Sequence, residues 1–143
     1  MVTITKSTKS LKIKDIKRNW HLVDLKGKIL GRAATEIAAF LQGKHKRDNV
    51  PYIDCGDFVV AINCAKVKVS GKKTISKQYT KYTGYPGGLK IKKYNELIIK
   101  DPKYIIRHAV LGMLPNNKLR KKRIARLYIF KDEKHNLESK FNN

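Results

Sequence analysis

Asp54 and Asp57 lie three residues apart, a spacing at which two carboxylates could act together in acid–base catalysis. In that mechanism one carboxyl group donates a proton while the other accepts one. The alternative is structural, because an aspartate side chain also accepts hydrogen bonds from nearby backbone N–H groups and so caps a turn. An apolar run typical of a strand begins directly after Asp57. We therefore predict a capped turn, with catalysis as the less favoured alternative.

No other motif completes a catalytic or metal-binding pattern. Residues 70–74 contain a Gly-Lys pair but lack the upstream glycine and the adjacent Ser or Thr of a phosphate-binding loop. The four histidines are scattered, and Cys55 and Cys64 lack metal-ligand spacing. Two cysteines are also too few for a disulfide scaffold, which favours a reducing, intracellular compartment. We therefore predict no catalytic residue, no metal, no cofactor and no small-molecule substrate, and expect that the chain is not an enzyme.

The net charge indicates the partner. The 143 residues include 33 Lys and Arg against 11 Asp and Glu, which gives a formal net charge of +22. Such a charge destabilises a compact fold by self-repulsion unless a polyanion offsets it. An anionic membrane surface would call for a long apolar span or a basic amphipathic helix with a bulky apolar face. No apolar run in the sequence approaches that length. Nucleic acid is therefore the predicted partner, and a membrane is not.

The cations gather in segments that lack acids. No acidic residue lies between Asp57 and Glu96, or between Asp101 and Asp132. Lysine and arginine bind phosphates, and arginine can hold one with two parallel hydrogen bonds. Clusters in several separate segments favour RNA, which is touched at many places, over one DNA groove read by one helix. The alternative for any single lysine is an ordinary solvated face, but acids are not interspersed as they are on such a face.

The residues predicted to bind RNA fall in the segments 44–47, 72–77, 82–87 and 118–123. Tyrosine rings in the third segment can stack on unpaired bases, with packing inside the fold as their alternative. Gly87 can let the backbone approach RNA closely, with an ordinary turn as its alternative. The predicted contacts are Lys44, His45, Lys46, Arg47, Lys72, Lys73, Lys77, Tyr82, Tyr85, Gly87, Lys118, Arg120, Lys121, Lys122 and Arg123. The density of charge in the last segment predicts exposure, so replacing Arg120 and Arg123 by alanine is expected to weaken RNA binding with little loss of fold.

Hydrophobic periodicity predicts the elements that hold these residues. Residues 34–41 have apolar side chains at i, i+3, i+4 and i+7, which predicts an amphipathic helix that ends near Gly43. Residues 58–62 form a short apolar run typical of a strand buried on both faces of a parallel sheet. Further strands are predicted at 20–25, at 127–130 and, more exposed, at 67–69. Residues 83–88 are predicted to form a loop.

The remaining segments are predicted to be mostly helical. Residues 95–100 are expected to form a short helix, and Pro102 opens a second one, because proline is tolerated in a first turn. Residues 118–126 are predicted to form a basic helix or coil. The order strand, helix, strand, then helices and a last strand predicts an α/β sheet with helices on its faces. No linker or repeat divides the chain. We assign residues 1–18 to an extended basic arm and 19–143 to one domain.

Several strings resemble the bacterial-type large-subunit ribosomal protein 13 family, and Gly43-Lys44-His45-Lys46 and Gly112-Met113-Leu114-Pro115 are the most specific. They occur in the family's order and cover roughly residues 18–135. The other matching strings are 20–24, 27–28, 30–34, 41–42, 54–57, 62–63, 69–73, 83–88, 109–110 and 126–127. The sequence departs from the family's usual ending at 135–139, where a second histidine and a glutamine are absent, so RNA contacts by this tail are not carried over.

The resemblance implies a three-layer α/β/α single domain around a mostly parallel sheet, to which the predicted elements contribute about four strands. It implies a structural protein that binds large-subunit rRNA in a cytoplasmic ribosome of the bacterial type, with a role early in assembly and neighbouring ribosomal proteins as partners. An organellar ribosome stays open. Two alternatives also stay open: a free regulatory RNA-binding protein, and a nucleotide-binding α/β enzyme argued from fold analogy alone.

Overall fold

The computed structural model describes residues 12–141. Most of the predicted N-terminal arm therefore lies outside the described residues. Its described remainder, residues 12–18, contains a single turn of 3-10 helix, η1 (Ile13–Asp15), with every side chain except Ile16 exposed.

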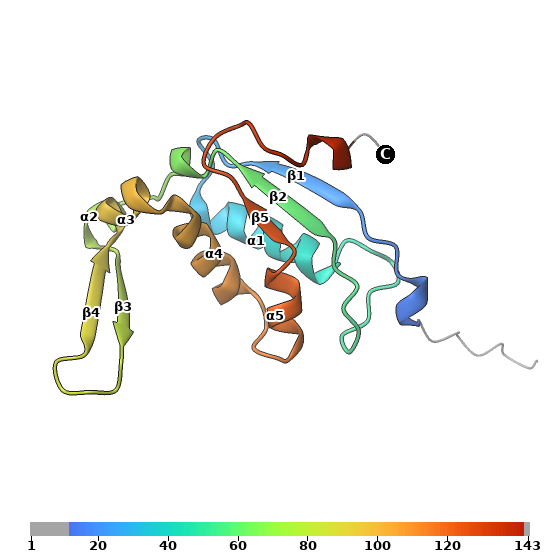
Figure 1. Ribbon diagram of the computed structural model, residues 1–143, viewed down its shortest axis with the longest axis horizontal. Helices are drawn as coiled ribbons and strands as arrows, with labels where there is room; N and C mark the ends of the chain where they lie inside the picture. Colours follow the sequence, from blue (N-terminus) through green and yellow to red (C-terminus); the bar gives the residue numbers. More distant parts are fainter. Residues whose placement is uncertain (1–11, 142–143) are drawn as a thin grey trace, which may run out of the picture.

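A parallel sheet forms the centre of the domain (Figure 1). Its strands, in spatial order, are β1 (Trp20–Asp24), β2 (Phe58–Ile62) and β5 (Leu127–Ile129). The four residues of β2 from Val59 onward are buried, as predicted for a strand with neighbours on both sides and cover on both faces. The sheet register aligns Val23 with Ala61 and Ala61 with Ile129, so these three side chains share one face.

Two long helices cover that face, α1 (Leu30–Gln42) and α4 (Pro102–Met113). All four residues of the predicted α1 stripe, at 34, 37, 38 and 41, are at most 3% exposed, which confirms the helix and its orientation. Gly43 ends α1 in the left-handed conformation, with φ of 76°, as predicted. Pro102 occupies the first turn of α4, and the Asp101 carboxylate accepts a hydrogen bond of 3.2 Å from the Tyr104 backbone N–H.

The opposite face of the sheet carries an aromatic cluster. The Trp20 ring stacks on Phe58 with centroids 4.5 Å apart and on Tyr128 at 5.6 Å. Phe141 meets Trp20 edge-on at 6.3 Å, and it follows directly after the short 3-10 helix η3 (Glu138–Lys140). In residues 12–141 this C-terminal segment covers part of the second face, on which Leu22 stays 50% exposed. The third layer is therefore thinner than a layer of α-helices.

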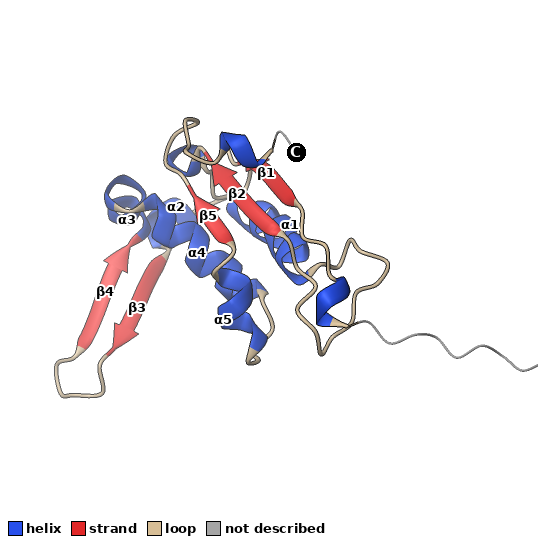
Figure 2. Cartoon of the chain, turned by 45° about the vertical axis from the view of Figure 1, so that its right-hand side comes forward, coloured by secondary structure: helices blue, strands red, loops and turns tan. Residues whose placement is uncertain are grey.

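A separate antiparallel pair, β3 (Gln78–Tyr82) and β4 (Leu89–Lys93), projects from the body as a hairpin (Figure 2). The predicted loop at 83–88 connects the two strands. Two short helices flank the hairpin, α2 (Lys73–Ser76) before it and α3 (Tyr94–Lys100) after it. At its root the buried ring of Tyr79 packs edge-on against Tyr104 at 5.9 Å and His108 at 5.2 Å. These aromatic contacts attach the hairpin to α4.

The single α/β domain with helices flanking a parallel sheet is confirmed, but the parallel sheet has three strands rather than about four. The predicted strand at 67–69 forms only an isolated bridge between Lys68 and Ile29, just before α1. Val67 is buried against the core. The apolar and polar residues of this segment alternate because Val67 packs into the core, although the backbone of the segment is not part of the sheet. The remaining short helices are η2 (Cys64–Lys66) and α5 (Leu119–Ile124). Throughout residues 12–141, each helix falls short of the length and apolarity needed to cross a bilayer.

Candidate nucleic-acid interface

Asp57 is fully buried beneath the predicted cationic segment 44–47, and four groups donate hydrogen bonds to its carboxylate. Its Oδ2 accepts from His21 Nε2 at 2.8 Å and from His45 Nε2 at 2.9 Å. Its Oδ1 accepts from the ammonium of Lys46 and from the backbone N–H of Asn19 at 3.0 Å. The carboxylate thus connects the start of β1 to the loop after α1.

The hydrogen-bond donors keep Asp57 ionised. Burial alone raises the pKa of Asp57, but the hydrogen bonds from Lys46, His21 and Asn19 outweigh burial and bring it below the ordinary value. An ionised carboxylate can only accept hydrogen bonds, so both imidazoles must carry a hydrogen on Nε2. The His21 ring stacks on Phe40 with centroids 4.3 Å apart, and this packing holds the ring in place.

Asp54 pairs with two arginines near the end of α5. Its Oδ1 accepts from Arg126 Nη2 at 2.7 Å, while Arg123 Nε lies 3.6 Å from the same oxygen. Arg126 also donates to the carbonyls of Asp57 and Leu41, each at 3.3 Å, and so connects the segment 54–57 to the end of α1. Burial raises the pKa of Asp54, but the bond and charge of Arg126, aided by Arg123, bring it below the ordinary value.

The segment 54–57 admits only glycine at its third position. A Cβ on Gly56 would stand 1.8 Å from the carbonyl oxygen of Leu41, far inside any real contact. The segment 54–57 therefore lies directly against the end of α1, which allows Arg126 to reach both. The predicted capped turn is wrong, because residues 54–57 form no turn and Asp57 accepts its backbone hydrogen bond from the distant Asn19. Neither carboxyl group has the raised pKa that a general acid needs at neutral pH.

His21, His45 and Asp57 also form the one group in residues 12–141 whose ligand atoms lie close enough to hold a metal ion, all within 4.8 Å. In a tetrahedral zinc site with bonds of about 2.0–2.2 Å, neighbouring ligand atoms stand roughly 3.3 Å apart. Here the two Nε2–Oδ2 distances are 2.8 and 2.9 Å, which suits a shared hydrogen better. Lys46 also occupies the second oxygen. The geometry favours hydrogen bonds over a metal, and the absence of a metal stays a prediction.

The exposure of the predicted contacts differs between segments. Lys44 and Arg47 are exposed, whereas Lys46 also donates to the carbonyls of Lys17 at 2.6 Å and Cys55 at 3.1 Å, so internal partners occupy its ammonium. The exposed residues of the other segments are Lys72, Lys73, Tyr82, Tyr85, Gly87, Lys118, Lys121 and Lys122. Lys77 is half-buried, with its Nζ 5.3 Å from the centre of the Tyr79 ring.

The predicted exposure of Arg120 and Arg123 is wrong. Arg123 is only 4% exposed, because the helix α5 turns it inward toward Asp54 while its neighbours Lys121 and Lys122 face solvent. Arg120 is half-buried and donates to the carbonyl of Leu111 at 3.1 Å. The two arginines therefore support the fold, and their joint replacement would not be a clean test of RNA binding.

We expect Arg123→Ala to lower the free energy of unfolding by about 1–3 kcal/mol, because it removes a buried partner of Asp54. Lys122→Ala, one residue away and exposed, should change it by no more than about 0.5 kcal/mol. Urea denaturation of the two variants measures the difference. Equal stability of the two would show that the inward position of Arg123 contributes nothing.

Stability should fall in acid because the pKa values of Asp54 and Asp57 are lower in the folded state than in the unfolded one. Their contribution is complete above the unfolded pKa, near 3.9 for an aspartate, and is lost as the pH falls through the folded pKa. We expect the melting temperature to drop steeply below about pH 4. The variant Asp57→Asn should show a shallower drop, and an unchanged slope would contradict the assignment.

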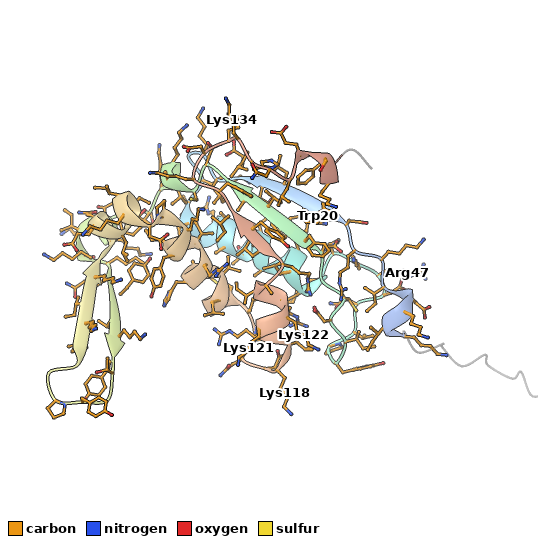
Figure 3. The ribbon with its side chains drawn as sticks, in the orientation of Figure 1. Trp20, Arg47, Lys118, Lys121, Lys122 and Lys134 are labelled. Atoms are coloured by element: carbon orange, nitrogen blue, oxygen red, sulfur yellow. The ribbon has the colours of Figure 1, made fainter. Side chains whose placement is uncertain are left out.

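Two protruding segments that bear predicted contacts, the hairpin tip and α5, extend to the same side of the domain (Figure 1). Lys118, Lys121 and Lys122 project from this side, whereas Lys134 lies at the opposite end of the molecule (Figure 3). Arg47 of the loop that follows α1 lies at a third place, beside η1. The predicted residues therefore lie on separate protrusions rather than in one pocket. The sequence reading missed the supporting residues His21 and Arg126, whose partners are 36 and 72 residues away.

The chain forms a strongly basic α/β domain, and its two buried carboxylates, Asp54 and Asp57, take part in internal ion pairs. These features define a protein of the class suited to binding a polyanion. The chain belongs to the ribosomal protein L13 family, whose sequence model matches residues 18–136. The predicted family is thus confirmed, and it is a family of ribosomal proteins rather than enzymes.

Relatives from several bacteria cover most of the chain. The large ribosomal subunit protein uL13 of Clostridioides difficile strain 630 is 51% identical over 121 residues, 85% of this chain and 85% of that protein. The protein of the same name in Chlorobium phaeovibrioides strain DSM 265 is 44% identical over 137 residues, 96% of this chain and 92% of that protein. The similarity therefore extends over nearly the full length of both proteins.

Proposed function

We propose that this chain is a structural component of the large ribosomal subunit that binds and compacts large-subunit rRNA early in assembly. The observation that carries the proposal is the set of exposed cations on separate protrusions of a domain with net charge +22. Each of the two relatives is named a large ribosomal subunit protein, which supports the proposal that this chain is also part of the large subunit. Other large-subunit proteins are its expected neighbours, and the bacterial source of the relatives supports the cytoplasm.

The mechanism is charge neutralisation between RNA segments. Phosphates of two RNA strands repel each other, and a rigid body that presents cations to both lowers the free energy of their close arrangement. The domain is suited to this role because its protrusions are attached to one core. Arg123 packs against Asp54 at the base of α5, and Tyr79 packs against α4 at the base of the hairpin. Each protrusion is therefore held at a defined place relative to the others.

The segment 44–47 combines exposed and supporting residues. Lys44 and Arg47 would meet phosphate directly, whereas Lys46 and His45 are held by Asp57. Because the His45 Nε2 hydrogen is given to the carboxylate, only the other ring nitrogen of this exposed side chain is available to RNA. Asp57 thus determines which groups of residues 44–47 are free to contact RNA.

Replacing Lys118, Lys121 and Lys122 of α5 by glutamine should weaken binding to a large-subunit rRNA transcript roughly tenfold at moderate salt. Loss of three phosphate contacts should also make the slope of log affinity against log salt shallower by roughly 2 to 3. The melting temperature should hardly change, since all three side chains are exposed. Filter binding at several salt concentrations measures both quantities.

A charge-matched control comes from the opposite end of the molecule. The triple replacement of Lys26, Lys66 and Lys134 by glutamine removes the same charge from exposed positions. If affinity depends on where the cations lie, this control should weaken binding less than the α5 variant does. Equal losses in the two variants would mean that only the total charge matters, which would contradict the proposed interface.

Sedimentation tests the proposed place in the cell. A lysate is separated on a gradient at moderate salt and each fraction is probed for this chain. The proposal predicts recovery with large subunits and with their early precursors. Recovery only in light fractions would favour a free regulatory RNA-binding protein and overturn the ribosomal assignment. Presence in mature subunits but in no precursor would overturn the early role in assembly.

A further inference from the structure

A pocket of about 400 Å³ lies between the first half of α4 and strand β5, away from the four predicted segments. Its volume lies within the range of roughly 300–1,000 Å³ that is usual for small-ligand sites. The lining combines the cations Lys103 and Arg107 with the rings of Tyr104 and Tyr128. Cations beside aromatic rings are the combination that holds a phosphate and a base together.

The two cations of the pocket are available for a ligand. Lys103 and Arg107 stand one helical turn apart on α4, and both are exposed. In residues 12–141 neither forms an ion pair with a carboxylate. Asp101 also lines the pocket, but its carboxylate caps α4 through the Tyr104 backbone N–H. The pocket is therefore positively charged overall and suits an anionic group.

Both rings are supported from behind and still partly open. Tyr104 is 41% exposed and packs against Tyr79 at 5.9 Å, and Tyr128 is 37% exposed and stacks on Trp20 at 5.6 Å. A ring held by another aromatic ring needs little further ordering when a base stacks on its free side, so less conformational entropy is lost on binding. Two such rings border one pocket here.

The edge of β5 adds polar backbone groups. β5 is an outer strand of the sheet, and its hydrogen bonds to β2 involve Tyr128 and Phe130, as in the bond of 2.8 Å from the Phe130 N–H to the Ala61 carbonyl. In a parallel ladder the residues between them point their N–H and C=O groups to the other side. Leu127 and Ile129 thus direct donors and acceptors to the free edge that borders the pocket.

We infer that this pocket takes one unpaired nucleotide of the bound RNA, with its base on a tyrosine ring and its phosphate between Lys103 and Arg107. The inference rests on the proposed rRNA binding and adds a base-stacking site to it. A free mononucleotide has the same chemical groups, but the pocket is an open groove that does not enclose a ligand, and the carboxylate of Asp101 at its border repels phosphate. The occupant that we infer is therefore a nucleotide held in place by the rest of a bound RNA.

Ultraviolet cross-linking of the full chain bound to a large-subunit rRNA transcript tests this inference. The nucleotide adducts are then located by mass spectrometry. We expect an adduct on Tyr104 or Tyr128, and we expect it to be lost in the variant Lys103→Gln with Arg107→Gln. A control variant with Lys66→Gln and Lys68→Gln removes the same charge from exposed positions elsewhere and should keep the adduct.

The outcomes separate the pocket from the proposed function. Binding of the transcript with adducts confined to other peptides would overturn the pocket while leaving rRNA binding intact. Loss of the pocket adduct on addition of millimolar adenosine monophosphate would identify a free nucleotide as the occupant and overturn the assignment to RNA. Failure of the chain to bind the transcript at all would overturn both the pocket and the proposed function.

Discussion

The variant Asp57→Asn is expected to lose about 3 kcal/mol of unfolding free energy, the usual cost of removing one partner from a buried ionic network. Asp57 has no exposed surface, and its carboxylate accepts hydrogen bonds from His21, His45, Lys46 and the Asn19 backbone. An amide keeps the shape but removes the charge and turns one acceptor into a donor that faces other donors. Urea denaturation at neutral pH measures the loss.

Glu36→Gln is the matched control for this prediction. Glu36 also pairs with a lysine, Lys28, at 3.1 Å, but both side chains are about half exposed. An exposed ion pair contributes between about 0 and 1 kcal/mol, so this variant should remain close to the parent in stability. The account of Asp57 would be refuted if the two variants lost similar amounts of unfolding free energy.

The second large effect concerns the hairpin tip. Tyr82 and Tyr85 are 64% and 75% exposed, so nothing in the fold explains two large rings at this place. If each stacks on an unpaired base, replacing both by leucine should cost about 2 kcal/mol or more of binding free energy, roughly a 30-fold loss of affinity. The melting temperature should stay unchanged because neither ring is buried. Binding to a large-subunit rRNA transcript and thermal melting are measured together.

Phenylalanine at the same two positions distinguishes stacking from other causes. The double variant Tyr82→Phe with Tyr85→Phe keeps both rings and removes only the hydroxyl groups, so it should bind nearly as well as the parent. A loss in the phenylalanine variant equal to that in the leucine variant would show that hydroxyl hydrogen bonds, and not stacking, carry the affinity. No loss in either variant would remove the tip from the interface.

The body of the fold could be predicted because its elements each bury one face. The α1 stripe at residues 34–41 and the apolar run of β2 both pack into the core, so their periodicity is strong. The same reasoning failed for residues 67–69, where Val67 packs in the core although its backbone stays outside the sheet. An alternation of apolar and polar side chains indicates which residues are buried. It does not show whether the segment pairs with a neighbouring strand.

The hairpin escaped prediction for the opposite reason. All five residues of β4 are exposed, and in β3 only Tyr79 is buried. Leu89 and Ile91 alternate with lysines in β4, but the alternation covers only three residues and neither side chain is buried. The sequence therefore indicates a lysine-rich segment there rather than two strands. The loop at 83–88 was predictable because glycine and proline mark turns whatever the flanking strands contain.

For the interface, the sequence predicted which segments are cationic but not which cations face solvent. Arg123 lies among Lys121 and Lys122, yet a short helix turns it toward Asp54, which is 69 residues earlier in the chain. Lys46 likewise forms an ion pair with the buried carboxylate of Asp57. Both pairings depend on how distant segments meet, and charge density along the chain carries no such information. The exposed lysines of α5 and the tip tyrosines keep their predicted role as proposals.

A structure of the large ribosomal subunit that contains this chain would show whether its exposed lysines contact rRNA phosphates. The quantity to measure is the distance from the side-chain nitrogens of Lys44, Lys118, Lys121 and Lys122 to the nearest phosphate oxygens. We expect hydrogen-bonding distances for these lysines of α5 and of the loop after α1, with RNA bases against the hairpin tip. Lysines that face bulk water or other proteins, with no phosphate near, would refute the proposed interface.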